Sequence, residues 1–172
     1  MAALSDVADR LESACRAIVQ LGPELEATGP WPLAKEFGAE PEASWGPPEV
    51  LAHVAEMLPY WMGEIERILA GSDAGAASGA VPFGRSSGDA VRIAIIGRDR
   101  TVPLVELLAR IAADSRRVAA RLRTLDVDDA GERLGLHPRL GQLRVADAAE
   151  RFLASHAEEH VLQLREILAA AA

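Results

Sequence analysis

The sequence is poor in the features that mark several large classes of protein. It holds a single cysteine, Cys15, in 172 residues, so no disulfide can form within the chain. No apolar run approaches the roughly 18–20 residues that a membrane span requires. The first residues show neither the basic nor the apolar region of a signal peptide. We therefore expect a soluble, cytoplasmic protein in which Cys15 is a small core residue.

Positive charge is also scarce. Acidic residues outnumber basic ones by 26 to 18, which gives a net charge of −8, and no basic cluster offsets it. A nucleic-acid groove is therefore not expected, and the arginines between residues 110 and 123 should lie on a solvated helix face. Hydrophobic residues make up 49% of the chain and charged residues 26%, which is globular composition. We expect a single domain over residues 1–172.

Apolar residues recur at helical spacing in four stretches. We expect helices over about 4–27, 47–71, 100–125 and 145–170. Pro23 should interrupt the first helix near its end, Pro59 should kink the second, and Asp99 should cap the third. No sheet is expected, because the apolar segment 93–96 is short and has no partner strand.

Four amphipathic helices of this length predict an all-α four-helix bundle. The three connections are long, over about 30–46, 72–98 and 127–143. At about 3.3 Å per residue, any of them could cross the whole bundle. The helical pattern by itself therefore leaves open which helices are antiparallel neighbours.

Three of the four histidines follow a metal-ligand pattern. His156 and His160 lie one turn apart, about 6 Å along the axis, in the apolar stripe of the fourth predicted helix. Two core histidines satisfied by carboxylates or carbonyls would give the same pattern. His53, however, can also face the core, from the second predicted helix, and metal sites are built between facing helices. Three neutral ligands leave one position open, as in catalytic sites. We predict a metal site at these three histidines.

Other polar residues could serve such a site, and they are weaker candidates for catalysis. Glu56, Glu159 and Gln163 each follow one of the three histidines by three residues. Gln163 could orient a ligand, and either glutamate could accept a histidine N–H, although solvent exposure would also explain both glutamates. His137 precedes Pro138 in a glycine-rich segment and is interpreted as a turn residue, with a pocket role left open. Tyr60, Trp61 and Phe152 are expected to be packing residues rather than a substrate cage.

Four short segments stand in an order that is more informative than any one of them. They are Trp45-Gly-Pro-Pro-Glu-Val-Leu-Ala-His53, Pro82-Phe-Gly-Arg85, Leu136-His-Pro-Arg-Leu-Gly141 and His156-Ala-Glu-Glu-His160-Val-Leu-Gln163. Together they resemble the DinB-like (YfiT-like) family of helical-bundle metalloenzymes. The resemblance covers most of the chain. The chain departs from the family pattern at Gly46, where relatives usually have a serine or threonine that caps the second helix.

The resemblance implies a left-handed four-helix bundle with a crossover connection between the second and third helices. It also implies a divalent metal ion, zinc or nickel, held by His53, His156 and His160, with water at the open position. Some relatives are transferases or isomerases that use bacillithiol, mycothiol or glutathione. The arginine- and alanine-rich composition is typical of a G+C-rich bacterial genome, which favours mycothiol as the thiol.

Two functions remain in competition. The first is a metal-dependent thiol S-transferase that acts on small electrophiles, since a metal-bound thiol is readily deprotonated; a bound water could instead become a hydroxide and hydrolyse a substrate. The second is a non-catalytic metal-binding or stress-response module with a structural metal. A protein carboxylate in the fourth position would favour the second function, and a cleft leading to the metal would favour the first. A small-molecule substrate and a homodimer are the expected partners.

Overall fold

The computed structural model describes residues 3–35, 42–73, 80–125 and 129–172, so parts of all three predicted connections lie outside the described residues. Most of the described chain is helical, as expected. The helices are α1 (Leu4–Gln20), α2 (Gly22–Thr28), α3 (Pro47–Asp73), α4 (Ala90–Asp99), α5 (Leu104–Leu125), α6 (Val145–Ala149) and α7 (His156–Ala171). Shorter elements are the 3₁₀ turns η1 (Glu42–Ser44) and η2 (Ala130–Glu132), the π-helical segment η3 (Glu150–Ser155), and the strands β1 (Ala80–Pro82), β2 (Leu134–His137) and β3 (Gly141–Arg144).

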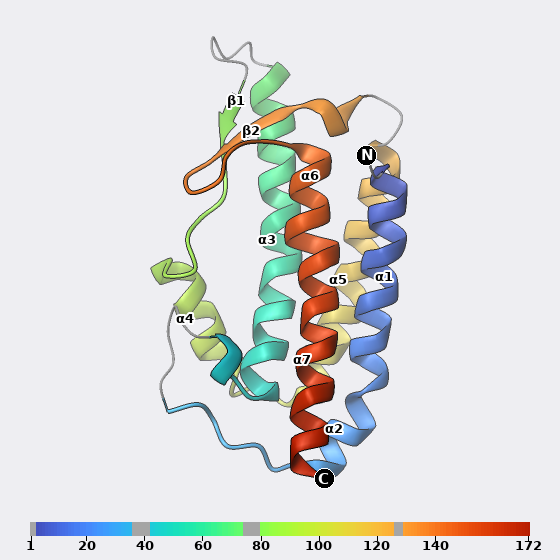
Figure 1. Ribbon diagram of the computed structural model, residues 1–172, viewed down its shortest axis with the longest axis vertical. Helices are drawn as coiled ribbons and strands as arrows, with labels where there is room; N and C mark the ends of the chain where they lie inside the picture. Colours follow the sequence, from blue (N-terminus) through green and yellow to red (C-terminus); the bar gives the residue numbers. More distant parts are fainter. Residues whose placement is uncertain (1–2, 36–41, 74–79, 126–128) are drawn as a thin grey trace.

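The long helices lie side by side (Figure 1). α1 packs against α5 and α7, and α3 also packs against α5 and α7. α6, η3 and α7 follow one another without a gap and form one rod (Figure 1). Among the described residues, no helix combines the length and the apolar character needed to cross a membrane.

The apolar stripes read from the sequence form the core. Burying these side chains supplies the main favourable free energy of folding, roughly 1.5–3 kcal/mol for each large aliphatic residue. Fully or nearly fully buried members of the stripes include Leu4, Val7, Leu11, Ile18, Leu51, Val54, Leu58, Ile65, Leu107, Ile111, Val118, Leu122, Leu153 and Leu164. Cys15 is also buried, as expected for a small core residue.

Pro23 interrupts the first helix, as predicted. α1 ends at Gln20 and α2 begins at Gly22, with the proline in the first turn of α2, where its missing N–H costs no hydrogen bond. Pro59, in contrast, lies inside α3, which continues past it to Asp73.

The segment before α3 is fastened to the helix by a buried carboxylate. Glu49 is fully buried, and its side chain accepts hydrogen bonds from the backbone N–H groups of Ala34 and Gly46. Arg100 completes the arrangement with an ion pair to the same carboxylate at 3.1 Å. These contacts fix the position of the chain at Gly46, between η1 and the start of α3.

Residues 93–96 form no strand, as expected, but the expected connection over about 72–98 contains a helix, and the expected cap of the next helix at Asp99 was wrong. The apolar segment 93–96 belongs to helix α4, whose N-terminus is capped by Asp89 through a hydrogen bond to the backbone of Arg92. Asp99 does not cap the next helix: it is the last residue of α4, and its carboxylate pairs with the side chains of Arg98 and Arg110. α5 begins only at Leu104, because a proline at 103 disfavours helical backbone at the residue before it.

A three-stranded sheet was not expected. β1 pairs with β2 in parallel and β2 pairs with β3 in antiparallel, so the order is β1-β2-β3. Gly135 of β2 lies against Phe83 and Ile68, so closely that a Cβ would fall 2.5 Å from the Phe83 ring. The sheet joins the connection that follows α3 to the connection that precedes α6, at one end of the long helices (Figure 1).

α3 and α5 run in the same direction, and the connection between them returns along the length of the molecule (Figure 1). This connection carries β1 and α4, and α4 packs against α3. Arg85 and Arg92 of this connection are thereby brought to the same side of α3 as His53.

Candidate metal centre

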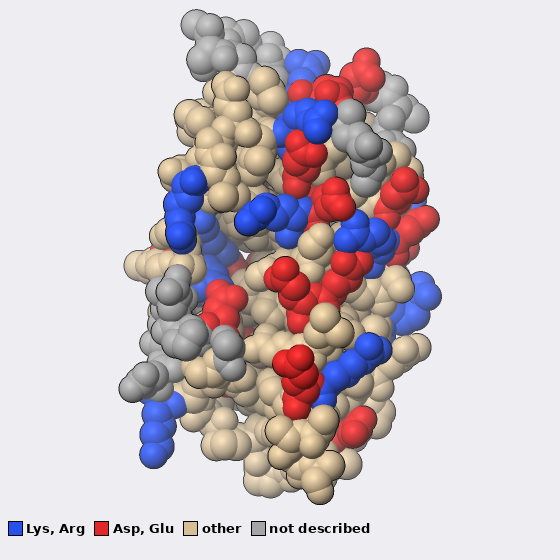
Figure 2. All heavy atoms as spheres, in the orientation of Figure 1, with Lys and Arg blue, Asp and Glu red and all other residues tan. Residues whose placement is uncertain are grey.

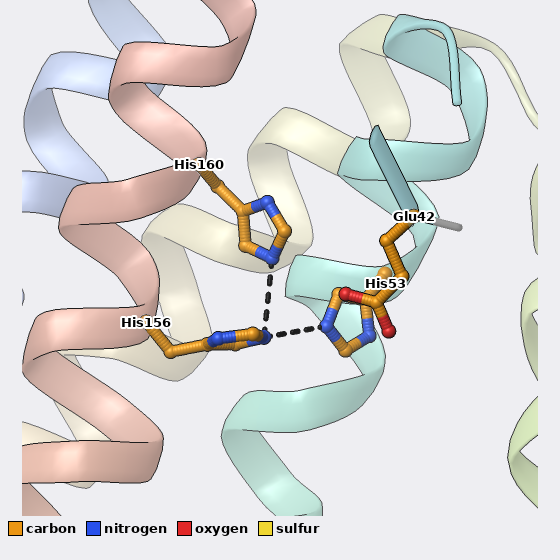
Figure 3. A group of neighbouring side chains, drawn as sticks. All are labelled: Glu42, His53, His156 and His160. Atoms are coloured by element: carbon orange, nitrogen blue, oxygen red, sulfur yellow. Dashed lines mark hydrogen bonds between the residues drawn. The ribbon is translucent and has the colours of Figure 1, made fainter. Parts of the chain in front are cut away.

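Four side chains from three elements meet between α3 and the rod that ends in α7. His53 comes from α3, His156 and His160 from the first turns of α7, and Glu42 from η1 (Figure 3). Each offers one potential ligand atom, and these four atoms all lie within 4.8 Å of one another. The three histidines predicted as ligands are thus close enough together to hold a metal ion, and the structure adds a carboxylate.

The histidine nitrogens have the spacing of donor atoms around a common ion. His156 Nε2 lies 2.9 Å from His53 Nε2 and 3.2 Å from His160 Nε2. Nitrogens bound to one tetrahedral zinc ion at about 2.0–2.1 Å would be separated by roughly 3.3 Å. The donor set also suits a borderline cation such as zinc or nickel, for which imidazole is a common ligand. These residues therefore fit a divalent metal ion.

Burial keeps the three imidazoles in the neutral form that binds metal. His53 and His160 are 3% and 4% exposed. Burial is the largest cause that lowers the pKa of His53 well below its ordinary value and the pKa of His156 and His160 to about 4. The nearby guanidinium of Arg92 lowers the pKa of His156 further. At neutral pH the imidazoles therefore carry no positive charge that metal binding would have to displace.

Gln163 determines the orientation of His160. The Gln163 side-chain nitrogen donates a hydrogen bond to the backbone carbonyl of Glu42 at 2.9 Å. Its oxygen therefore faces His160 Nδ1, also at 2.9 Å, and accepts the imidazole N–H. The lone pair of His160 is then on Nε2, which points into the cluster. Gln163 thus contacts the histidine that its spacing places beside it, and it would hold His160 in this tautomer if Nε2 binds a metal ion.

The two candidate glutamates have different environments. Glu159 Oε2 lies 3.3 Å from His156 Nδ1, so it can accept that N–H while His156 Nε2 faces the cluster, although most of the Glu159 side chain is exposed. Glu56 is not exposed. It is buried and forms an ion pair with Arg85, and its second oxygen has no hydrogen-bond partner among the described residues.

The interpretation of His137 as a turn residue was wrong. His137 is the last residue of β2. It is buried in an aromatic cluster with Trp61, Phe83 and Phe152. The Trp61 and Phe152 rings stack with centroids 4.0 Å apart. His137 Nδ1 accepts a hydrogen bond from the backbone of Arg139, and burial lowers the pKa of the imidazole. His137 is not among the four residues of the metal cluster.

Glu42 is the member of the cluster that the sequence did not reveal. It forms a close ion pair with Arg92, whose guanidinium nitrogen also lies 3.4 Å from His53 Nδ1. Glu42 lies 11 residues before His53 in a stretch expected to be irregular, so no helical spacing connects it to the histidines. The only sequence signal is its nearness to the Trp45-Gly-Pro-Pro segment that begins α3.

A cavity of about 560 Å³ borders the cluster at His156. Phe152, Ser155 and Glu159 line it from η3 and α7, and Leu143 lines it from β3. Acidic and basic side chains are mixed over the face that carries the α6–α7 rod, and the surface is hollowed beside it (Figure 2). His156 is the cluster residue that lines this cavity, and its side chain is 27% exposed.

Comparison with known proteins adds no relative: no family model matches the chain, and neither a curated protein nor a solved structure matches it.

Proposed function

We propose that the chain is a metal-dependent protein of the DinB-like superfamily, a four-helix bundle with a crossover connection, and that it transfers a small thiol to small electrophiles. The long helices, the parallel course of α3 and α5 and the histidine cluster support this proposal. The sequence segments that resemble the family support it independently.

One observation carries the proposal: three Nε2 atoms from two helices converge at ligand spacing, and their imidazoles are neutral at physiological pH. His53, His156 and His160 would hold a divalent ion, zinc or nickel. Such an ion, held by neutral ligands, keeps its charge and lowers the pKa of a coordinated thiol or water.

The surrounding residues have distinct tasks. Gln163 accepts the Nδ1 proton of His160, so that its Nε2 lone pair faces the cluster, and the Glu159 carboxylate lies 3.3 Å from Nδ1 of His156. The cavity beside His156 admits the substrate, and the Phe152 ring supplies an apolar wall for an electrophile such as a haloaromatic compound.

Elemental analysis of the purified protein tests the proposal. We expect close to one zinc or nickel ion per chain, retained in His137→Phe and lost in His160→Ala. The His137→Phe protein is the matched control, because it removes a buried histidine outside the cluster while keeping an aromatic ring. If the unmutated protein contains no metal and does not bind added zinc or nickel, the proposal is wrong. Thiol transfer is then measured with a haloaromatic electrophile.

The second candidate function is that of a non-catalytic module with a structural metal, and Glu42 favours it. A carboxylate among the four ligand atoms could complete a closed tetrahedral set, as in structural sites. Cobalt-substituted protein separates the two functions, because its visible spectrum reports the coordination of the ion. A structural site predicts a spectrum that no added thiol changes.

A further inference from the structure

We propose that Arg92 is an anion-binding residue of this site, and that the Glu42 side chain occupies the place of the carboxylate of a small carboxylate-bearing thiol. The inference rests on the proposed function, because the thiol sulfur would bind at the histidine cluster.

The Arg92 side chain is held in place by contacts that do not involve Glu42. It is 6% exposed, and its Nη1 donates a hydrogen bond to the backbone carbonyl of Ser87 at 2.9 Å. The guanidinium carbon lies 5.5 Å from the centre of the Trp45 ring. The backbone of Arg92 is also bound by the Asp89 cap of α4. Arg92 would therefore remain beside the cluster if Glu42 moved away.

Glu42 is the partner that can leave. Its side chain is 26% exposed, and η1, on which it lies, is only three residues long. The backbone of Glu42 is fixed by two hydrogen bonds to its carbonyl, from the side chain of Gln163 and from the backbone of Trp45. A rotation of the side chain alone would therefore move the carboxylate away and leave the turn in place.

Arg92 requires an anion in this position. A buried charge that loses its partner is strongly destabilising, so the Glu42 carboxylate can leave only if another anion takes its place. A divalent ion in the cluster would add positive charge beside the guanidinium. A ligand with both a thiolate and a carboxylate would balance this charge better than a neutral thiol.

The short distances limit the size of the ligand. Arg92 lies 3.4 Å from His53 Nδ1, and the Glu42 carboxylate lies within 4.8 Å of the ligand atoms of all three histidines. A sulfur at the cluster and a carboxylate at Arg92 must therefore be separated by very few bonds. Thioglycolate, with one carbon between sulfur and carboxylate, is a suitable probe. 2-Mercaptoethanol, which carries a hydroxyl in place of the carboxylate, is the matched control ligand.

Titration of cobalt-loaded protein with the two thiols tests the inference. Sulfur coordination is followed by the thiolate-to-cobalt absorption band, which does not depend on turnover. We expect thioglycolate to bind at least about tenfold more tightly than 2-mercaptoethanol to cobalt-loaded Glu42→Gln protein, in which its carboxylate gives Arg92 a charge-assisted partner that 2-mercaptoethanol cannot give. Equal affinities for the two thiols, corrected for their thiol pKa values, would overturn the inference.

Substitution of Arg92 assigns the preference to one residue. Arg92→Gln should abolish the preference for thioglycolate and leave the affinity for 2-mercaptoethanol little changed. Arg98→Gln removes an arginine of the same helix that is 70% exposed, and should keep the preference. A preference that survives Arg92→Gln contradicts the inference, even if the metal is bound as proposed.

Glu42→Gln gives a test that requires neither the metal nor a folded Arg92 variant. In this protein Arg92 has lost its carboxylate partner, so acetate should raise the melting temperature of the metal-free protein more than chloride at equal ionic strength. The unmutated protein should show little difference between the two salts. If acetate has no specific effect on Glu42→Gln, the inference fails. If acetate stabilises this variant but no metal binds, the proposed function fails and the anion site stands.

Discussion

The side-chain oxygen of Gln163 lies 2.9 Å from Nδ1 of His160, and this contact decides which nitrogen of His160 faces the cluster. Gln163→Leu removes the acceptor and frees the ring to rotate. We expect zinc affinity to fall about 10- to 100-fold, the usual effect of losing the hydrogen-bond partner of a ligand. Competition with a chromogenic chelator measures the zinc affinity of each variant. Gln163→Glu keeps an acceptor for His160 and should lose less zinc affinity. Equal losses of affinity in the two variants would argue against an orienting role for Gln163.

Metal binding should stabilise the folded protein strongly. If the unfolded chain has no affinity for zinc, a free concentration of a thousand times the dissociation constant adds about 4 kcal/mol to the free energy of unfolding. Urea unfolding with zinc, compared with unfolding in a chelator, measures this gain. His53→Ala should show almost no gain, since it removes the ligand from α3. A comparable gain in this variant would place the metal elsewhere.

The metal-free protein should lose stability in mildly acidic solution. In the folded state the pKa values of His156 and His160 fall from 6.5 to about 4, because burial disfavours the charged imidazole. Between these pH values the unfolded chain binds more protons, so the free energy of unfolding decreases as the pH is lowered from 6.5 toward 4. The slope is at most about 1.4 kcal/mol per pH unit for each histidine.

Urea unfolding at several pH values in the presence of a chelator checks this slope. His160→Gln should show a shallower dependence between pH 6.5 and 4.5, because one of the titrating groups is gone. The carboxyl groups of Glu158 and Asp99, whose pKa values are lowered by arginine partners, titrate below this interval. A pH-independent stability of the unmutated metal-free protein would contradict the prediction.

Gly84 should tolerate no side chain. Its φ is +80°, and a Cβ would lie 2.4 Å from the ring of His137. Gly84→Ala should therefore lower the free energy of unfolding by about 1–3 kcal/mol through backbone strain and the clash. Gly141→Ala is the matched control: its φ is +74°, but nothing lies within 4 Å of the added carbon. Urea unfolding should show a smaller loss for the control, and equal losses would mean that contact with His137 is unimportant.

The sequence predicted the long helices well, because each carries a stripe of large apolar residues that recurs every three or four positions and becomes the core. It missed the sheet because the strands are three or four residues long, too short for a recognisable alternation. In β2 the alternation is nevertheless present in the structure, where Gly135 and His137 face inward while Leu136 is exposed.

Within one helix, the spacing of residues in the sequence indicated which side chains meet at the site. For residues on the connections, the sequence contained no such indication. His156 and His160 meet because four residues make about one turn. A spacing of three residues was ambiguous: Gln163 contacts His160 at this spacing, whereas Glu56, at the same spacing from His53, pairs with Arg85 of the connection after α3. Glu42 and Arg92 reach the cluster from two other connections. Their positions depend on tertiary contacts, which have no local signal in the sequence.

The π-helical segment Glu150–Ser155 has a consequence for sequence comparison. A π turn holds about one residue more than an α turn, so it is equivalent to a single-residue insertion inside a helix. His156 and His160 both lie after it and keep their mutual spacing, whereas Phe152 lies within it. Deleting one residue from this segment would therefore convert it to α-helix and leave the faces of α6 and α7 in register, with the histidine pair intact. An alignment with a relative that lacks the π turn should therefore place a one-residue gap between residues 150 and 155.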